Sequence, residues 1–574
     1  MNPDDLKLWF RRQPWMQSIR LANLRRRQRT GLYPDWRALL GEDWAKWTEL
    51  RNTAAANAQA PRILLATSVG IHAAAATFDS YLAVALTARG AHCDALLCDA
   101  ALPACMAADY TWYPDPQRFA HRGSTADLCT SCFAPADKLF GAHGLGLDVL
   151  RYGRFLSYAD RSRASAIASG TDYHSIPALT LDGIALGEAA MSGALRFFAR
   201  GELDDTHAEA REPIVRRYLE AACLTLFAIR GLLRQRRYDV IVGHHGIYVP
   251  QALVAAAARE AGVRFVAWNP AYRLGCFILS HGETYHRSML TEPPSVWEDL
   301  TLSDAQRDEL MRYLSDRATG KQDWIAFHRP DTDASDRLIA DLGLNSGKPT
   351  VIMLTSVIWD AQLHYQQRAF KSQVEWALQT VRHFAGRPDV QLAIRVHPAE
   401  EKGSLPSRQP IAAEIEAVFP KLPPNVVIIR PNDRVSTYAL AEACDAAIIY
   451  ATKAGIELAA RGIPGIVAGE SWLKGKGIGF DCDNPVTYDR MLAKLPFRRR
   501  LDPARTSRAQ TYAYHFFFRR MIPIPAMMKA DLPGLPFVIM PTPLDEFMTG
   551  GSVSLDLICR GIIAGAPFVF DAAK

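Results

Sequence analysis

The chain has 574 residues, which is too long for a single hydrophobic core, so at least two domains are expected. Apolar residues make up 49% and charged residues 22%, the balance of a soluble globular protein and not of a disordered or fibrous chain. Residues 1–30 contain eight Lys or Arg and two Asp, a net charge of +6 that equals the net charge of the whole chain. The remaining residues are therefore neutral as a whole, which argues against a nucleic-acid-binding body.

Residues 1–60 are predicted to form a basic N-terminal arm, in which arginines alternate with large apolar side chains such as Trp9, Phe10 and Trp15. Two interpretations are open: an interfacial helix on an anionic membrane surface, or a basic helix packed on the body through its aromatic residues. The arm lacks the apolar segment of a signal peptide, and the chain has no uncharged apolar window of about 18 residues. We expect a cytoplasmic protein that can lie on the inner face of the plasma membrane.

Residues 61–300 are predicted to form a first Rossmann-like α/β domain, because short apolar runs alternate with helical periodicity. The expected strands are Arg62–Ser68, His92–Asp99, Tyr238–Gly243 and Val263–Asn269, and the expected helices are Ala73–Arg89 and Gln251–Glu260. The first strand–helix turn contains a single glycine, Gly70, in place of the GxGxxG fingerprint of dinucleotide sites. This disfavours an NAD-dependent dehydrogenase.

Four polar side chains in this domain are candidates for a catalytic base because each lies on or next to a loop at a strand end: His72, Asp79, His245 and Glu283. We favour His245, because it follows a buried strand and precedes Gly246, whose lack of a side chain allows a ligand to approach closely. The alternative for His245 is a structural or helix-capping histidine.

Four of the ten cysteines form a spaced group that ends in a CxxC pair: Cys98, Cys105, Cys129 and Cys132. In a reducing compartment such a group is compatible with a structural zinc ion, which takes four soft ligands in a tetrahedron. The gap between the first two cysteines is wider than in the usual paired knuckle, so a structural thiol cluster without metal is the alternative. An iron–sulfur cluster is the least favoured interpretation.

A charged linker at 301–348 precedes a second Rossmann-like domain, residues 349–500. Its expected strands are Pro349–Ser356, Val390–Val396, Val426–Ile429, Ala446–Tyr450 and Pro464–Ala468, with a helix at Gln366–Phe384. Because the carboxyl ends of parallel strands meet at one edge, polar residues that follow two of these strands are expected to converge there: Arg395, His397, Thr452 and Lys453. Such an edge, with helix N-termini beside it, is suited to a phosphate. Several alternatives stay open: His397-Pro398 could be a simple turn, Lys453 a solvated charge, Glu457 an exposed helix residue, and Arg395 a surface ion pair in place of a second phosphate contact.

Two facing α/β halves with a phosphate site in the second describe a GT-B glycosyltransferase, and the residues also resemble a particular family. The motifs that carry the resemblance are Ile394–Glu400 (IRVHPAE), Tyr450–Glu457 (YATKAGIE), Ala459–Pro464 (AARGIP) and Ile358–Asp360 (IWD). Together with Tyr512–Met521 and Leu555–Phe568, they make the second half similar to bacterial capsule and surface-polysaccharide biosynthesis proteins. Related transferases include Kdo-type, sialyl-type and glycerophosphate-type enzymes.

The resemblance implies a role for individual residues. By position, His397, Thr452 and Lys453 take the phosphate-binding role, and Glu457 takes the role of holding the ribose. An imidazole and a hydroxyl can donate to phosphate oxygens, and a carboxylate can accept from two ribose hydroxyls. Residues 501–574 are expected to contain the helix that crosses back to the first half, at Ala509–Met521, and a Pro-rich tail.

The donor is predicted to be a CMP-linked sugar, because no DxD pair stands at an obvious strand end to hold a metal-bridged diphosphate. Catalysis then requires no cofactor, and the partner is a glycan or lipid-linked glycan acceptor that binds to the first half. Three alternatives stay open: a phosphotransferase acting on a CDP-linked polyol, a UDP- or GDP-sugar transferase, and a non-catalytic scaffold of capsule assembly that binds nucleotide or glycan.

Overall fold

The computed structural model describes residues 13–29, 31–203, 208–318, 323–324, 338–365, 368–532 and 535–571. The chain divides into two compact units. The first holds the described residues up to Phe198, then Leu203–Tyr285 and those from Met521 onward, and the second holds Ala199–Glu202 and His286–Arg520. The linker expected at 301–348 therefore belongs to the second unit where it is described, and the chain returns to the first unit at Met521 for its C-terminal part.

The first unit is built on a seven-stranded sheet whose order is β15-β8-β7-β6-β1-β2-β3. Its strands are β1 (Arg62–Ser68), β2 (His92–Leu97), β3 (Asp148–Arg151), β6 (Val240–His244), β7 (Arg264–Pro270), β8 (Cys276–His281) and β15 (Ile522–Pro523). Within this sheet, β3, β2, β1, β6 and β7 pair in parallel with their neighbours. In contrast, β8 is antiparallel to β7, and β15 is antiparallel to β8. Numbered along the chain, the order is 3-2-1-4-5-6-7, which extends the 3-2-1-4-5-6 order of a Rossmann fold by one strand.

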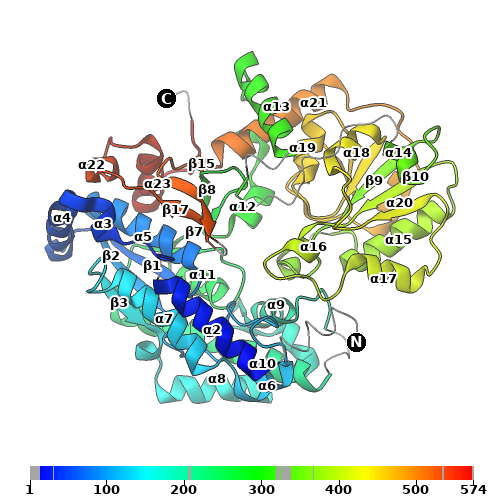
Figure 1. Ribbon diagram of the computed structural model, residues 1–574. Helices are drawn as coiled ribbons and strands as arrows, with labels where there is room; N and C mark the ends of the chain where they lie inside the picture. The colour runs from blue at the N-terminus through cyan, green and yellow to red at the C-terminus, as the bar shows by residue number, and fades with distance from the viewer. Residues whose placement is uncertain are drawn as a thin grey trace. The chain divides into compact units, whose positions relative to one another are not determined.

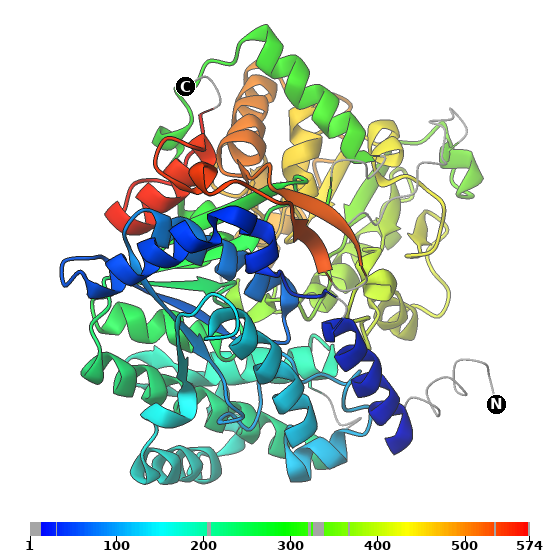
Figure 2. The ribbon, with the colours of Figure 1, turned by 60° about the vertical axis from the view of Figure 1, so that its left-hand side comes forward.

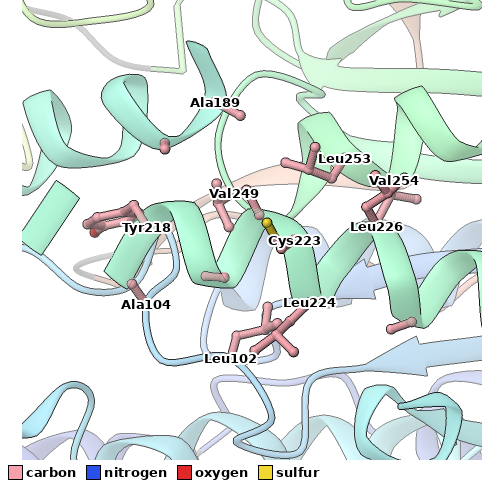
Figure 3. Packing of buried hydrophobic residues seen from close by; sticks show 14 of the residues in the cluster. Leu102, Ala104, Ala189, Tyr218, Cys223, Leu224, Leu226, Val249, Leu253 and Val254 are labelled. Atoms are coloured by element: carbon pink, nitrogen blue, oxygen red, sulfur yellow. The ribbon is translucent and has the colours of Figure 1, made fainter. Parts of the chain in front are cut away.

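Helices cover both faces of this sheet. On one face, α5 (Ala73–Ala88) contacts β1 and β2, and α7 (Ala126–Phe140) contacts β2 and β3. On the other, α11 (Gln251–Glu260) contacts β1, β6 and β7, and is itself packed against α10 (Ala208–Gln235). Figure 3 shows this second layer: Leu224 of α10 lies beside Leu102 of the loop after β2, and Leu253 and Val254 come from α11.

The other elements of the first unit surround this core. They are α2 (Pro14–Arg29), α3 (Trp36–Leu40), α4 (Trp44–Ala56), α6 (Pro116–Arg122), α8 (Tyr158–Gly170), α9 (Leu186–Phe198), α22 (Leu544–Phe547), α23 (Val553–Ala564) and two hairpins, β4 (Thr180–Leu181) with β5 (Ile184–Ala185) and β16 (Met527–Leu532) with β17 (Leu535–Ile539). The described part of the predicted basic arm is thus helical at α2, which lies alongside α7 (Figures 1 and 2).

The second unit repeats the Rossmann order in a six-stranded sheet, β11-β10-β9-β12-β13-β14. Its strands are β9 (Thr350–Leu354), β10 (Gln391–Arg395), β11 (Val426–Ile429), β12 (Ala446–Ile449), β13 (Gly465–Val467) and β14 (Phe480–Asp481), and all adjacent strands are parallel. Its helices are α12 (Tyr285–Thr291), which begins in the first unit, then α13 (Asp304–Ala318), α14 (Leu338–Asp341), α15 (Gln373–Ala385), α16 (Ala399–Lys402), α17 (Ile411–Val418), α18 (Thr437–Ala443), α19 (Ala454–Ala460), α20 (Pro485–Leu492) and α21 (Pro503–Tyr514).

Helices also cover both faces of this second sheet. Figure 1 shows α15 and α17 on one side of β9 and β10, and α18 and α19 on the other. The amphipathic helix α15 begins at Ser372, whose hydroxyl caps it by accepting from the N–H of Glu375, and it buries Trp376 against the sheet. The helix expected at Gln366–Phe384 therefore starts later, and residues 366–367 lie outside the described residues.

The prediction of two doubly wound Rossmann-like α/β domains with a basic helical arm is confirmed. The expected strand Arg62–Ser68 and the expected helix Gln251–Glu260 have the bounds that the sequence predicts. The helix expected at Ala509–Met521 is the end of α21 followed by one π-helical turn, His515–Arg519. Within the described ranges, no helix is both long enough and apolar enough to cross a membrane.

Candidate functional site

Each sheet reverses its strand order at one point, and several, but not all, of the polar residues singled out above lie at these two points. In the first unit the reversal lies between β1 and β6, which pair directly through Leu64 and Ile241. The loops that leave these two strands diverge there, and ligands of open α/β sheets bind in the resulting crevice. His72 follows β1, and His244 ends β6; their rings stack with centroids 4.8 Å apart.

The two ring nitrogens of His72 have different hydrogen-bonding roles: Nδ1 accepts, and Nε2 carries the hydrogen. Its Nδ1 accepts from the backbone N–H of Ala75, 3.2 Å away, and so caps the first turn of α5. Burial, together with the positive charge of Arg196, lowers the pKa of His72 to about 4, so the ring is neutral at pH 7. Because Nδ1 is an acceptor, the hydrogen of the neutral ring is on Nε2. In this tautomer Nε2 cannot take a proton from an acceptor hydroxyl.

His245 follows β6 in the left-handed region of backbone space, with φ of 66°. Ser68, the last residue of β1, has φ of 59°, so non-glycine residues with positive φ occur at both strands that flank the reversal. Such conformations are costly and cluster at functional sites. Burial, with the nearby charges of His72 and Arg196, lowers the pKa of His245 to about 4. A neutral imidazole held next to Gly246 is consistent with the predicted proton acceptor.

Asp79 does not lie at the crevice, which corrects the prediction that it is a candidate base. It is in the second turn of α5 and fully buried, because α5 turns this face toward the sheet. Its two oxygens accept from Thr67 Oγ1 and Trp268 Nε1, both at 2.7 Å. Burial raises the pKa of Asp79 to about 7, while the two hydrogen bonds oppose the shift. The carboxyl group is a core polar group that ties α5 to β1 and β7.

Glu283 follows a strand end that the sequence did not distinguish from the others. The preceding strand β8 runs antiparallel, so its last residue, His281, pairs with Val266 near the start of β7. This is the opposite strand end from those of β1 and β6, which His72 and His245 follow. The side chain of Glu283 is exposed. Glu283, one of the four candidate bases, therefore does not share an edge with the two histidines.

A cavity of about 230 Å³ opens beside His72. Its polar lining comes from Arg27 of α2, Arg196 of α9 and Asp109 of the loop after β2, and Trp112 adds an aromatic surface. Arg196 Nη1 donates to the carbonyl of Met106 at 2.6 Å and lies 3.9 Å from an oxygen of Asp109. Sequence reasoning missed this group, since its members lie far apart along the chain and only the packed fold brings them together.

In the second unit the reversal lies between β9 and β12, and hydroxyl and imidazole groups surround it. Thr355, directly after β9, accepts from the backbone N–H of His397 through Oγ1 at 3.0 Å, which links the loops after β9 and β10. Nδ1 of His397 accepts from the N–H of Ala399 at 3.1 Å, so its hydrogen in the neutral ring is on Nε2. Ser356 Oγ is buried and has no hydrogen-bond partner within the described residues. It is a second hydroxyl at this strand end.

Thr452 and Lys453 follow β12 at the same reversal. Thr452 Oγ1 accepts from the N–H of Ala454 at 3.3 Å, and its carbonyl accepts from Ser471. Lys453 is 21% exposed and lies 3.9 Å from a carboxylate oxygen of Glu457. Burial, aided by the charge of Arg317, lowers the pKa of Lys453 to about 8. The loops after β9, β10 and β12 thus carry hydroxyl, imidazole and ammonium groups at the carboxyl ends of three adjacent parallel strands, and their role as phosphate ligands stays a prediction.

Arg395 and Glu457 lie below this edge and not on it. Arg395 is buried and donates to Thr437 Oγ1 and to the carbonyl of Arg430, at 3.3 and 2.6 Å. It is therefore neither a surface ion pair nor, in this conformation, a phosphate ligand. Glu457 has no exposed surface; it accepts from Tyr438 and lies 3.3 Å from Nε of Arg317. Its carboxylate is enclosed in a buried charge network with Arg317 and has no surface open to a nucleotide, which does not favour the ribose role.

The four spaced cysteines lie near enough to interact, since the pKa of each is raised in part by another of the four, and the zinc ion itself stays a prediction. Within the part of the chain that the structure describes, no three His, Cys, Asp or Glu side chains are grouped closely enough to hold a metal ion. Cys132 Sγ instead accepts from the N–H of Ile71 at 3.2 Å. Burial raises the pKa of all four thiols, to about 12 for Cys98 and about 11 for Cys105. Without a metal, these thiols are therefore neutral at pH 7.

Comparison with known proteins adds little to this geometry. No family model matches the chain, and no curated protein is similar to it in sequence. Among solved structures, the beta Kdo 2,4 transferase KpsC of Thermosulfurimonas dismutans is 14% identical, with 48% of this chain and 79% of that chain covered and a TM-score of 0.32. Sucrose-phosphate synthase from Thermosynechococcus elongatus is 12% identical, with 79% and 94% covered and a TM-score of 0.27. The UDP-GlcNAc 2-epimerase from Neisseria meningitidis, bound to UDP-GlcNAc, is 8% identical, with 79% and 97% covered and a TM-score of 0.23. At these values the strand order of the chain itself remains the basis for the fold.

Proposed function

We propose that this protein is a glycosyltransferase of the GT-B type that moves a sugar from a nucleotide donor, CMP-linked by preference, to a growing capsule or surface glycan. The donor binds at the edge of the second unit, and the acceptor binds at the edge of the first. The single observation that carries the proposal is that both sheets have the Rossmann strand order with polar side chains gathered at the reversal of each. The capsule context rests on the resemblance of the motifs around His397 and Thr452.

The edge of the second unit suits a phosphate. Nε2–H of His397, the hydroxyls of Thr452 and Ser356, and the ammonium group of Lys453 can each donate to phosphate oxygens. With a pKa of about 8, Lys453 is still mostly cationic at pH 7. A donor with one phosphate needs no divalent metal to bridge two, so the proposal is metal-independent.

The edge of the first unit suits proton transfer. Neutral His245 accepts the proton of the acceptor hydroxyl while that oxygen forms a bond to the anomeric carbon of the donor sugar. The bond from the anomeric carbon to the phosphate oxygen breaks, and the nucleoside phosphate leaves with the electron pair. His72 takes no part in this proton transfer; its Nε2–H orients the acceptor.

A thermal-shift screen of CMP, CDP, UDP and GDP, with and without Mg²⁺, tests the donor class, because a ligand that binds only the native state raises its stability. We expect CMP alone to stabilise the protein. Stabilisation by CDP would favour a polyol-phosphate transferase, and stabilisation by UDP or GDP only would reject the CMP assignment. A nucleotide that binds without being released from any donor sugar in the presence of acceptor glycans would favour the scaffold alternative.

The protein is further proposed to contact an anionic membrane from the cytoplasmic side. The outer face of α2 exposes Trp15 and Ile19, at 48% and 45%, in the same helix as the exposed Arg26 and Arg29. We expect sedimentation with phosphatidylglycerol vesicles but not with phosphatidylcholine vesicles, and loss of binding when Trp15 and Ile19 are both replaced by Ser. Val553→Ser, at another exposed apolar residue, is the matched control. Equal binding by the double variant would reject this contact.

A further inference from the structure

The cavity beside His72 has more hydrogen-bond donors than acceptors. Both polar contacts of Arg196 with described residues use Nη1, so Nη2 and Nε remain for a ligand. Arg27 adds a second guanidinium group to the lining, and the remaining polar group of His72 is its Nε2–H. The one carboxylate of the lining is largely engaged: Oδ1 of Asp109 accepts from Thr111 and from the N–H of Trp112.

Such a lining selects an anion. Guanidinium groups match carboxylate and phosphate oxygens with two parallel hydrogen bonds, and partial burial strengthens these bonds. The aromatic ring of Trp112 and the apolar side chain of Leu24 border the same space and suit the body of a sugar ring. With about 230 Å³, the cavity is smaller than the pockets of roughly 300 Å³ or more that hold drug-sized ligands, so it fits a single ring.

The N-terminal helix α2 completes this cavity. Gln17 Nε2 donates to the carbonyl of Trp112 at 3.0 Å, and Arg20 lies over the ring of Trp112 with its guanidinium carbon 4.4 Å from the centroid. Farther along, Arg25 donates to Ser131 at 3.0 Å and pairs with Asp127 at 3.1 Å. These contacts fix the helix so that Leu24 and Arg27 face inward and line the cavity. The basic arm thus contributes a wall, and one guanidinium group, to a site in the body.

We propose that this cavity binds an anionic monosaccharide unit of the acceptor, a sugar acid or a sugar phosphate, and that Arg27 of the N-terminal arm is a binding residue for it. The inference rests on the proposed function, because it specifies the acceptor for the edge where His72 and His245 lie. Without α2 the site loses one of its two guanidinium groups. The arm is then part of substrate recognition in addition to any contact with a membrane.

The test is calorimetric titration of the full-length protein with glucuronate, glucose 6-phosphate and glucose, in the absence of nucleotide. At least one of the two anionic sugars is expected to bind about tenfold or more tightly than glucose, since a charge-assisted hydrogen bond contributes about that factor. Arg27→Gln is expected to weaken this binding by a similar factor. Arg26→Gln removes the same charge one residue earlier, on the exposed side of α2, and is expected to change nothing.

The outcomes separate the two sugar classes and the two edges. Tight binding of glucuronate alone identifies a carboxylate as the ligand group, and tight binding of glucose 6-phosphate alone identifies a phosphate. Equal affinity for glucose, no binding of either anion, or an Arg27→Gln variant with unchanged affinity would overturn the inference. So would anion binding that falls in His397→Ala but not in Arg27→Gln, because the sugar would then bind in the second unit. If Arg27→Gln unfolds, Arg196→Lys tests the same point, because it keeps the charge but loses the planar fork.

The proposed function can fail independently of this inference. CMP stabilisation is measured on the same variants, and Arg27→Gln is expected to leave it unchanged, since Arg27 belongs to the first unit. Anion binding without any nucleotide binding would reject the proposed function and keep the site. Nucleotide binding without anion binding would do the reverse.

Discussion

Replacing Arg317 by Leu should destabilise the second unit strongly. Arg317 ends α13 and is 1% exposed. Its guanidinium group lies 3.3 Å from an oxygen of Glu457, and it donates to Asp323 at 2.7 Å and to the hydroxyl of Tyr313 at 3.0 Å. The variant would leave two buried carboxylates without their main counter-charge. Removing one partner of a buried ion pair costs about 3–5 kcal/mol in free energy of unfolding.

Urea unfolding followed by tryptophan fluorescence measures this loss. The matched control is Arg312→Leu, on the same helix but exposed, where a change within about 0.5 kcal/mol is expected. Glu457→Gln should also lose stability, because the network loses its central anion. If Arg317→Leu is no less stable than Arg312→Leu, or if Glu457→Gln keeps full stability and loses only nucleotide affinity, Glu457 is a ligand residue and the reasoning fails.

Three further predictions concern buried acids and metal. Burial raises the pKa of Glu400 to about 8, above its ordinary 4.5, so this carboxyl lowers stability as the pH rises from 4.5 to 8. Glu400→Gln should therefore be more stable than the wild type by about 4 kcal/mol at pH 8 and no more stable at pH 4.5, and a constant difference in urea unfolding would contradict this. Burial likewise raises the pKa of Asp79 to about 7, so ionising this carboxyl between pH 4 and pH 7 costs folding free energy. The stability advantage of the wild type over Asp79→Asn should therefore shrink over this range. Thermal unfolding measures it, and a growing advantage would refute the assignment. EDTA should leave the melting temperature unchanged, because no described group of side chains is placed to hold a metal ion; a clear fall would restore the zinc site.

The alternation of apolar runs was sufficient to predict the two sheets and the strand ends. His72 and His245 were each singled out because they follow a predicted strand, and the pairing of β1 with β6 brings these strand ends together. The direction of a strand is not readable from such a run. The strand Cys276–His281 was not among the predicted strands, and its antiparallel direction carries Glu283 to the other end of the sheet.

Side chains that depend on distant partners could not be predicted. Glu457 has the spacing of a ligand residue in the first turn of α19, but Tyr438 and Arg317, the latter from a helix much earlier in the chain, enclose it. The cavity has the same origin, since Arg27 and Arg196 meet only through packing. A sequence signal did exist for His244, which ends a buried strand directly before His245, and it stacks on His72.

The central claim is that the loops after β10 and β12 hold the phosphate of a nucleotide. Calorimetric titration of CMP into the wild type, His397→Ala and His383→Ala tests it most directly. His383 lies in the last turn of α15, before β10 begins, and so removes a histidine from the same unit away from the carboxyl ends of the strands. We predict that His397→Ala weakens CMP binding at least about tenfold without loss of stability, since one charge-assisted hydrogen bond is lost. His383→Ala should bind CMP as the wild type does, and normal CMP affinity in His397→Ala would contradict the claim.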